Sequence, residues 1–222
     1  KKILKKLSKR SDFKGYVDVL FFLFLLLLSG YFCILVWGTW WAPLAFFTYG
    51  NIFYSKVISI QHETNHETYF KSRWLNKTFY NITSLLGGFE AVRWKWSHFH
   101  HHSYTIFTSK EEYDYENNSP RPTEPIRFLI NFLPLGPLLN IQKIRHFTHF
   151  EIIKHAFGII APVAKMTIPD TEIKKVISSS RMYVLFWAIV VFSSLYFKTW
   201  LPIFMLILPP FYGKELSNDH HH

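Results

Sequence analysis

Apolar residues are concentrated in two blocks near the two ends of the chain. The first, Leu20–Trp37, reads LFFLFLLLLSGYFCILVW and carries no charge. A run of about 18 or more apolar residues has the length of a membrane-spanning helix. The second block, Met182–Phe197 followed by Trp200–Phe211, is interrupted by Lys198 and Pro202. It is long enough for two short spans joined by a tight turn.

A less apolar stretch follows the first block. Residues 44–60 contain Gly50, Asn51 and Lys56, and they continue without a helix-breaking signal into the polar segment Gln61–Glu67. This pattern predicts a second span whose helix extends from the bilayer into water.

These patterns predict an all-α integral membrane protein with a single domain over residues 1–222. Two transmembrane hairpins are expected, with a polar helical segment at about 61–181 between them. The expected spans are residues 16–38, 44–60, 182–197 and 200–212. Within the polar segment, residues 128–139 and 152–164 are typical of helices that lie on the membrane surface.

Charge predicts the orientation. The net charge of +10 includes a basic arm before the first span, which short flanks of this kind usually keep in the cytosol. The N-terminus and the polar segment are therefore expected to be cytosolic. The three sequons at Asn76, Asn81 and Asn117 should then carry no glycan. The charge indicates membrane lipid rather than nucleic acid as the contact, and the first run is too long for a cleaved signal peptide.

Histidine is the unusual component, with 12 in 222 residues, against a single cysteine, Cys33. One cysteine excludes a disulfide framework and a cysteine-rich metal site. The first cluster, His62-Glu63-Thr64-Asn65-His66, places His62 and His66 one helical turn apart on one face. Trp94 and Trp96 precede the second cluster and are typical of membrane-interface anchors.

The second cluster is Ser97-His98-Phe99-His100-His101-His102. On a helix His98, His101 and His102 share one side, and His100 points away from it. Neutral imidazole binds zinc, iron, copper and nickel. Five histidines exceed the three or four ligands that one zinc needs, which favours two metal ions. The first cluster also satisfies the H-E-x-x-H pattern of zinc proteases, with Glu63 as general base, but that reading leaves the second cluster unused.

The two clusters resemble the first two histidine boxes of the membrane fatty acid desaturases. Gln61–Ser72 is similar to the first box, H-x(3,4)-H, and Trp96–Thr105 to the second, H-x(2,3)-H-H. Leu208–Gly213 is similar to the end of the last span of that family. The resemblance covers about Tyr16 to Gly213.

The resemblance implies an O2-dependent enzyme with two iron ions that removes hydrogens from the acyl chain of a membrane lipid. A separate donor of the ferredoxin or cytochrome b5 type would supply electrons. The implied iron ligands are His62, His66, His98, His101 and His102. Residues that would orient them are Glu63, Glu67, His100 and Asp114.

The family also carries a third box, [HQ]-x(2,3)-H-H, beyond its last span. Only Lys214–His222 follow Gly213 here, and the terminal His220–His222 resemble an affinity tag. Either ligands lie in a part not included in this sequence, or His146, His149 and His155 fill the site.

Three alternatives stay open from the residues. One is a hydroxylase or ketolase of the same superfamily that acts on lipids, alkanes or carotenoids. The second is the zinc membrane protease, and the third is a truncated relative that keeps the fold without activity.

Overall fold

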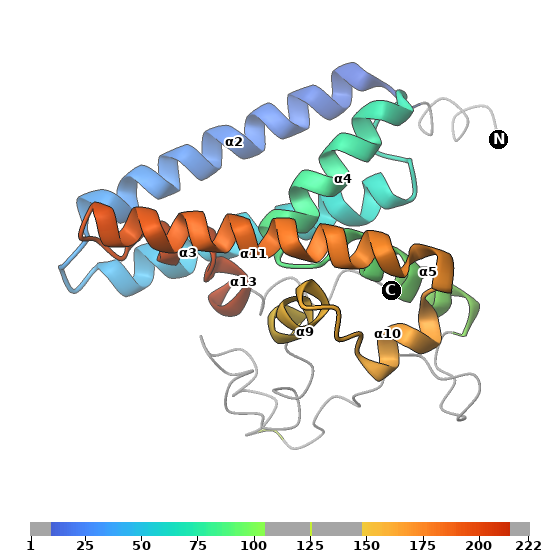
Figure 1. Cartoon of the computed structure of the whole chain (residues 1–222). Coiled ribbons are helices and arrows are strands. Elements are labelled where there is room, and N and C mark those ends of the chain that lie inside the picture. Colours follow the sequence, from blue (N-terminus) through green and yellow to red (C-terminus); the bar gives the residue numbers. More distant parts are fainter. Residues whose placement is uncertain (1–9, 105–124, 126–147, 214–222) are drawn as a thin grey trace.

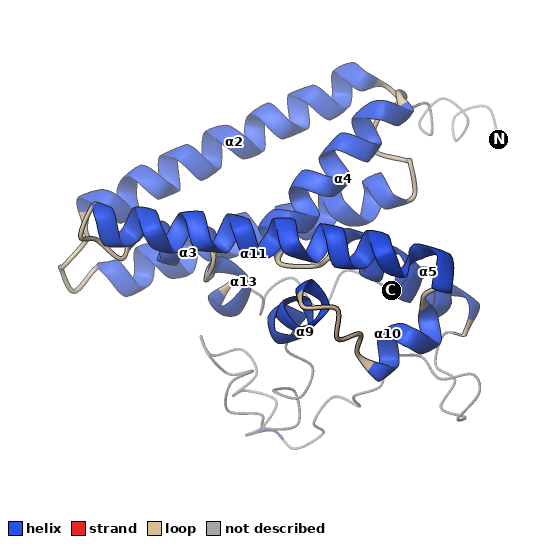
Figure 2. Ribbon diagram, viewed as in Figure 1, coloured by secondary structure: helices blue, strands red, loops and turns tan. Residues whose placement is uncertain are grey.

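The computed structural model of the chain describes residues 10–104, 125 and 148–213. These residues form helices and connecting loops, and no strand occurs among them, which confirms the predicted all-α class (Figures 1 and 2). A 3-10 turn at Asp170–Glu172 precedes α11. In chain order the helices are α2 (Asp12–Leu35), α3 (Ala42–Asn65), α4 (Arg73–Gly87), α5 (Ala91–Ser103), α9 (Thr148–Ala156), α10 (Pro162–Thr167), α11 (Ile173–Tyr196), α12 (Leu201–Leu206) and α13 (Pro209–Tyr212).

Among the residues that the structure describes, two helical stretches are long and apolar enough to cross a membrane, namely Asp12–Leu35 and Asp170–Tyr196. At 1.5 Å per residue, the 24 residues of α2 extend about 36 Å, which exceeds the ~30 Å hydrocarbon layer. Only 22% of the apolar window in each stretch is buried, and side chains such as Leu27 (72% exposed) and Phe192 (68%) face outward. A core helix of a soluble protein would cover these side chains, so their exposure is what a lipid-facing helix requires.

Helix α3 is as long as α2 but lies in the centre of the molecule. Its side chains Phe53, Val57 and Ile60 are almost completely buried, and it contacts α2, α4 and α13. Lys56 forms an ion pair with Asp18 of α2, with 2.6 Å between nitrogen and oxygen. This central, partly polar helix falls outside the two apolar candidates, so its role as a span stays a prediction.

The second apolar block differs from its expected form. Helix α11 begins at Ile173 rather than near residue 182. The expected helix at 200–212 is divided into α12 and α13, of six and four residues. Proline lacks the N–H group that a helix interior needs, and Pro209-Pro210 starts the second of these pieces. Each piece is too short to cross a bilayer alone, and a fourth span at 200–212 stays a prediction.

The prediction of one continuous surface helix over residues 152–164 is wrong. The structure has α9 ending at Ala156 and α10 beginning at Pro162. Gly158 lies between them with a φ of 81°, a left-handed conformation that ends the helix and that glycine adopts without strain. The other expected surface helix, 128–139, lies outside the described residues.

Helix α13 is fixed to the middle of α3 by close backbone packing. The ring of Tyr212 lies directly on Gly50, and a Cβ atom at residue 50 would overlap it. The Tyr212 hydroxyl donates to the carbonyl of Phe204 at 2.6 Å, and the Tyr49 hydroxyl donates to that of Met205 at 3.0 Å. Gly50 therefore allows the broken α12–α13 segment to pack against α3.

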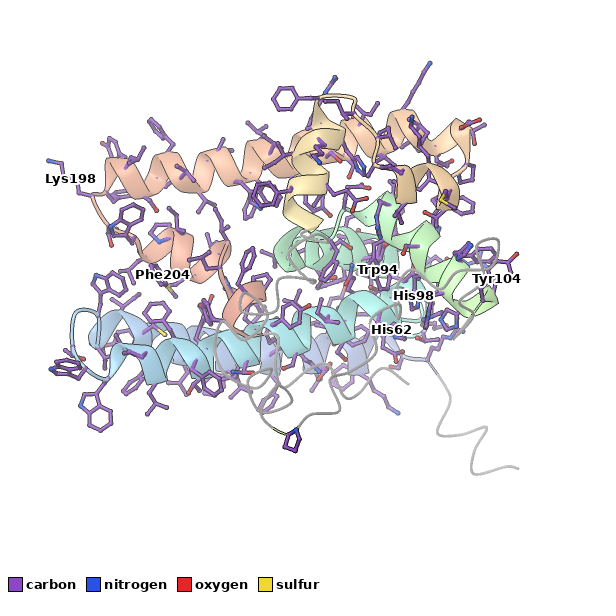
Figure 3. All side chains as sticks on the ribbon, turned by 90° about the horizontal axis from the view of Figure 1, so that it is seen from below. His62, Trp94, His98, Tyr104, Lys198 and Phe204 are labelled. Atoms are coloured by element: carbon purple, nitrogen blue, oxygen red, sulfur yellow. The ribbon has the colours of Figure 1, made fainter. Side chains whose placement is uncertain are left out.

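The molecule has two distinct ends. The loop between α2 and α3 and the turn between α11 and α12 lie together at one end (Figure 1). Figure 3 places Lys198 at this end and His62 and His98 at the other. Trp40 (99% exposed) and Trp200 (62%) flank the loop end, where membrane proteins concentrate tryptophan at the lipid–water boundary.

Substitution of Gly50 by valine tests the packing of α13 on α3. Because the new side chain would collide with the Tyr212 ring, we expect Gly50→Val to lower the free energy of unfolding by about 1–3 kcal/mol. That loss corresponds to a thermal midpoint lower by several degrees, measured in detergent micelles.

The matched control is Thr48→Val on the same helix, because Thr48 is exposed and its hydroxyl bonds only to the carbonyl of Leu44 among the contacts described. Its thermal midpoint should stay near that of the unsubstituted chain. Equal midpoints for both variants would contradict the proposed role of Gly50.

Candidate metal centre

The last turn of α3 and the second half of α5 bring four histidines together. His62 and His66 come from the end of α3, and His98 and His102 come from α5. One ring nitrogen of each lies within 4.8 Å of the corresponding nitrogen of every other. Both pairs are separated by four residues, so each helix presents its two imidazoles on one face.

Three of these imidazoles form a tight triangle of Nε2 atoms. The separations are 3.1 Å for His66–His98, 3.3 Å for His66–His102 and 3.0 Å for His98–His102. Metal–imidazole bonds of ~2.0–2.1 Å separate neighbouring ligand nitrogens by roughly 2.9 Å in octahedral and 3.4 Å in tetrahedral geometry. The triangle lies within that range, so these residues fit one metal ion with His62 beside it.

The surroundings of His66 favour its neutral form, as judged from the direction of its pKa. Partial burial lowers the pKa of His66, and the nearby His98 lowers it further, although Glu63 acts in the opposite direction. A lowered pKa favours the neutral ring, which is the form that binds a metal.

His101 and His100 occupy different places on α5. His101 is buried, with its ring centroid 5.8 Å from that of His98 and 5.6 Å from that of His102, but it is not part of the four-histidine cluster. A helix turns ~100° per residue, so His101 and His102 point in clearly different directions. His100 lies beside Tyr104, at 4.6 Å between ring centroids, and is also outside the cluster.

Glu63 and Glu67, which were expected to orient the imidazoles, contact Thr68 and Arg73. The Glu63 carboxylate accepts a hydrogen bond from the Thr68 hydroxyl. Glu67 adopts a φ of 55° and pairs with Arg73 at 3.4 Å. Orientation of the ligands by these carboxylates stays a prediction. Asp114 and His146 lie outside the described residues, as does the side chain of His149.

Trp94 lies against the metal ligands, although the sequence analysis assigned it to the membrane interface. Its indole is stacked on the His98 ring, with 4.4 Å between centroids and 12° between planes. The i, i+4 spacing of Trp94 and His98 was the signal available in the sequence. Trp96, two residues later, packs instead against the apolar cluster around α10.

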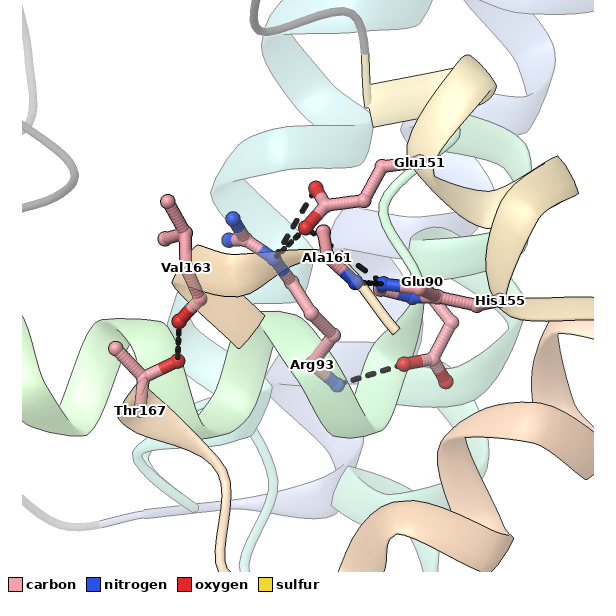
Figure 4. A network of polar contacts seen from close by, with 7 residues as sticks. All are labelled: Glu90, Arg93, Glu151, His155, Ala161, Val163 and Thr167. Atoms are coloured by element: carbon pink, nitrogen blue, oxygen red, sulfur yellow. Dashed lines mark hydrogen bonds and ion pairs between the residues drawn. The ribbon is translucent and has the colours of Figure 1, made fainter. Parts of the chain in front are cut away.

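A second polar group lies next to this centre and involves α5 and α9 (Figure 4). Glu90 is buried and accepts the backbone N–H groups of Val92 and Arg93, so it caps the start of α5. Burial raises the pKa of Glu90. Arg93 bonds to Glu151 of α9 at 3.4 Å. Glu90 directly precedes α5, so its contact with the start of that helix is local in the sequence. Glu151, the partner of Arg93, is 58 positions away, and the sequence does not reveal this pairing.

His155, one of the spare ligands, belongs to this second group. It is completely buried, and its Nε2 accepts the N–H of Ala161 at 3.1 Å. Burial lowers its pKa, with Glu151 opposing that change. His155 thus stabilises the loop after α9, outside the four-histidine cluster.

Comparison with known proteins gives one family. The sequence model of the family described as fatty acid desaturase matches residues 38–214, which include both histidine clusters. No curated protein and no solved structure matches the chain.

Removal of one histidine from the triangle should abolish tight metal binding. We expect His66→Ala to weaken Co²⁺ binding by at least ~100-fold, because a direct ligand matters more than the outer contacts that alone contribute 10–100-fold. His100→Ala should change the affinity by no more than a few fold, since this ring is outside the cluster. Titration of the purified chain, followed by visible absorption, measures both, and equal losses would contradict the four-histidine site.

Proposed function

The chain belongs to the fatty acid desaturase family, and on this premise we propose that it introduces a double bond into the acyl chain of a membrane lipid, using O2. The four-histidine cluster at one end of the helices is the observation that carries the proposal. Members of this family are membrane-associated oxidoreductases with iron, so the site and the family agree in chemistry.

The histidines have distinct roles in this proposal. His62, His66, His98 and His102 hold one iron ion between α3 and α5. His101, on a neighbouring side of α5, would contribute to holding a second iron ion. When bound, the pair of irons supplies the reduction of O2 with electrons from a separate donor of the ferredoxin or cytochrome b5 type.

In this proposal the histidine side chains would hold the iron ions beside the acyl chain. Each turnover removes two hydrogens from neighbouring carbons of the acyl chain and reduces O2 to water with a pair of external electrons and protons. His98 is 5% exposed, whereas His66 and His102 are exposed. The described part of the site is therefore closed to water on the His98 side and open on the side of His66 and His102.

The lipid-facing helices define where the substrate comes from. Helices α2 and α11 lie in the bilayer, with α3 and the 200–212 segment completing the hairpins. The histidine end faces the cytosol, and the tryptophan-rich loop end faces the opposite side. An acyl chain in the cytosolic leaflet then reaches the histidines from within the membrane.

The protease alternative finds less support from the geometry. A zinc protease needs its glutamate beside the metal-bound water. Glu63 is exposed and bonds to Thr68, while the second histidine box joins the same cluster as the first. A hydroxylase or ketolase would use the same metal ligands, and only the reaction product separates it from a desaturase.

Expression in a host that lacks the corresponding lipid tests the reaction. We expect new double bonds in membrane acyl chains and about two irons per active chain. In His102→Ala we expect the new double bonds to disappear and the iron content to fall. Lys95→Ala, an exposed change on the same helix, should retain both. Gas chromatography with mass spectrometry identifies the products. Hydroxylated lipid would support the alternative, and one zinc without iron would contradict an oxygen-dependent enzyme.

Cysteine labelling tests the topology, because the single native cysteine, Cys33, is buried. In intact cells a membrane-impermeant maleimide should label Trp40→Cys and Lys198→Cys at the loop end. It should label Lys77→Cys on α4 only after the membrane is opened. The reverse pattern would contradict cytosolic histidines.

The sequons give a partial second test of topology. Asn76 is 1% exposed and its side chain bonds to the backbone of Phe70, so it is inaccessible on either side of the membrane. Asn81 is exposed and should carry no glycan in a eukaryotic host. Asn117 lies outside the described residues.

A further inference from the structure

We propose that Trp94 is a positioning residue of the metal centre, whose indole face holds the His98 imidazole in the orientation that directs its Nε2 toward those of His66 and His102. The proposal rests on the metal centre assigned above and assigns it a side chain that is not itself a ligand. Figure 3 shows Trp94 beside His98 and His62.

The contacts around His98 are of two kinds. Trp94 is nearly parallel to its ring, with 12° between planes and 4.4 Å between centroids. The rings of His62, His66 and His102 meet the same imidazole at 78°, 65° and 84°. His101 is also only moderately inclined to His98, with 29° between planes, but its ring centroid is farther away at 5.8 Å. Trp94 is therefore the closest ring stacked on His98, and the three ligand imidazoles meet it at steep angles.

Rotation of the imidazole is the freedom that this stack restricts. The torsion between Cβ and the ring of histidine is broad, so the backbone of α5 alone does not define the direction of Nε2. The flat indole of Trp94 lies against one face of the His98 imidazole. It prevents rotations of the imidazole that would push the edge of that ring into the indole. The same indole also meets His62 edge-on, at 6.4 Å and 76°, so it contacts one ligand from each helix.

Trp94 also contacts Tyr80 of α4, with 6.2 Å between ring centroids and 46° between planes. The preceding residue, Arg93, is paired with Glu151 of α9, and both side chains are largely buried. Trp94 lines a small pocket together with Arg93, Glu151, Ile152 and His155. Glu90 caps α5, and Arg93 is paired with Glu151 of α9 (Figure 4). These contacts restrain the rotation of α5 about its axis, and with it the directions of Trp94 and His98.

Two tryptophans of α5 provide a matched experiment. Trp94→Leu removes the aromatic face, and Trp96→Leu makes the same change on the side of α5 that packs against α10. In Co²⁺ titrations of the full chain in detergent, we expect Trp94→Leu to bind about 10-fold more weakly, the scale of other contacts that orient ligands. Trp96→Leu should stay within ~2-fold.

The conservative variant separates positioning from folding. Trp94→Phe keeps a flat ring and should recover most of the affinity, together with the visible absorption bands of bound Co²⁺. Altered bands in Trp94→Leu, with unchanged helical circular dichroism, would report a changed ligand geometry in a folded protein. Co²⁺ should also quench less of the total tryptophan emission in Trp94→Phe than in Trp96→Phe, because it quenches the stacked indole most strongly.

The outcomes distinguish this proposal from the one on which it rests. Affinity and bands in Trp94→Leu equal to those of the unsubstituted chain would overturn the role of Trp94 and leave the metal centre intact. Equal losses in the Trp94 and Trp96 variants, without recovery in Trp94→Phe, would also overturn it. Failure of the unsubstituted chain to bind Co²⁺ would overturn the metal centre, and with it this role of Trp94.

Discussion

The approach of imidazole nitrogens to within 3.0–3.3 Å of one another is the constraint on which the rest of this structure depends. Neutral imidazoles at that distance present lone pairs to the same point, which is unfavourable unless a cation or shared protons occupy it. The packing of α3, α4 and α5 must therefore hold the rings together. A metal ion bound there would in turn stabilise this packing, because a ligand that binds the folded state adds to its stability.

The segment between the two histidine boxes positions α5 relative to α3. Helix α4 returns along α3 and ends at Gly88, whose φ of 72° reverses the chain. The hydroxyl of Tyr80 then donates to the carbonyl of Ala91 at 2.6 Å, and that of Tyr183 donates to the carbonyl of Phe89 at 2.7 Å. These bonds connect the start of α5 to both α4 and the long apolar helix α11. The helix that carries the second histidine box is thus tied directly to one of the two candidate membrane spans.

Much of this organisation is visible in the sequence because it depends on local periodicity. The apolar run that became α2 and the four-residue spacing in both histidine boxes need only helical geometry to be interpreted. The same reasoning was wrong at 152–164, where the helix is divided in two. It also missed the contact of Trp94 with His98, while the interfacial role of Trp94 stays a prediction. At 152–164 the glycine and proline were present in the sequence, whereas for Trp94 the missing information was which neighbour the side chain meets.

The sequence by itself determined the helical class, the two long apolar helices and the set of histidines suited to binding metal, because each follows from residue type and spacing along one helix. Only the tertiary structure decided which four of those histidines meet, that His101 lies beside rather than within the group, and that Glu151 supports α5 from α9. The physical reason is that the angle and rotation of α5 relative to α3 come from contacts between residues tens of positions apart. A pattern within one helix contains no record of those contacts.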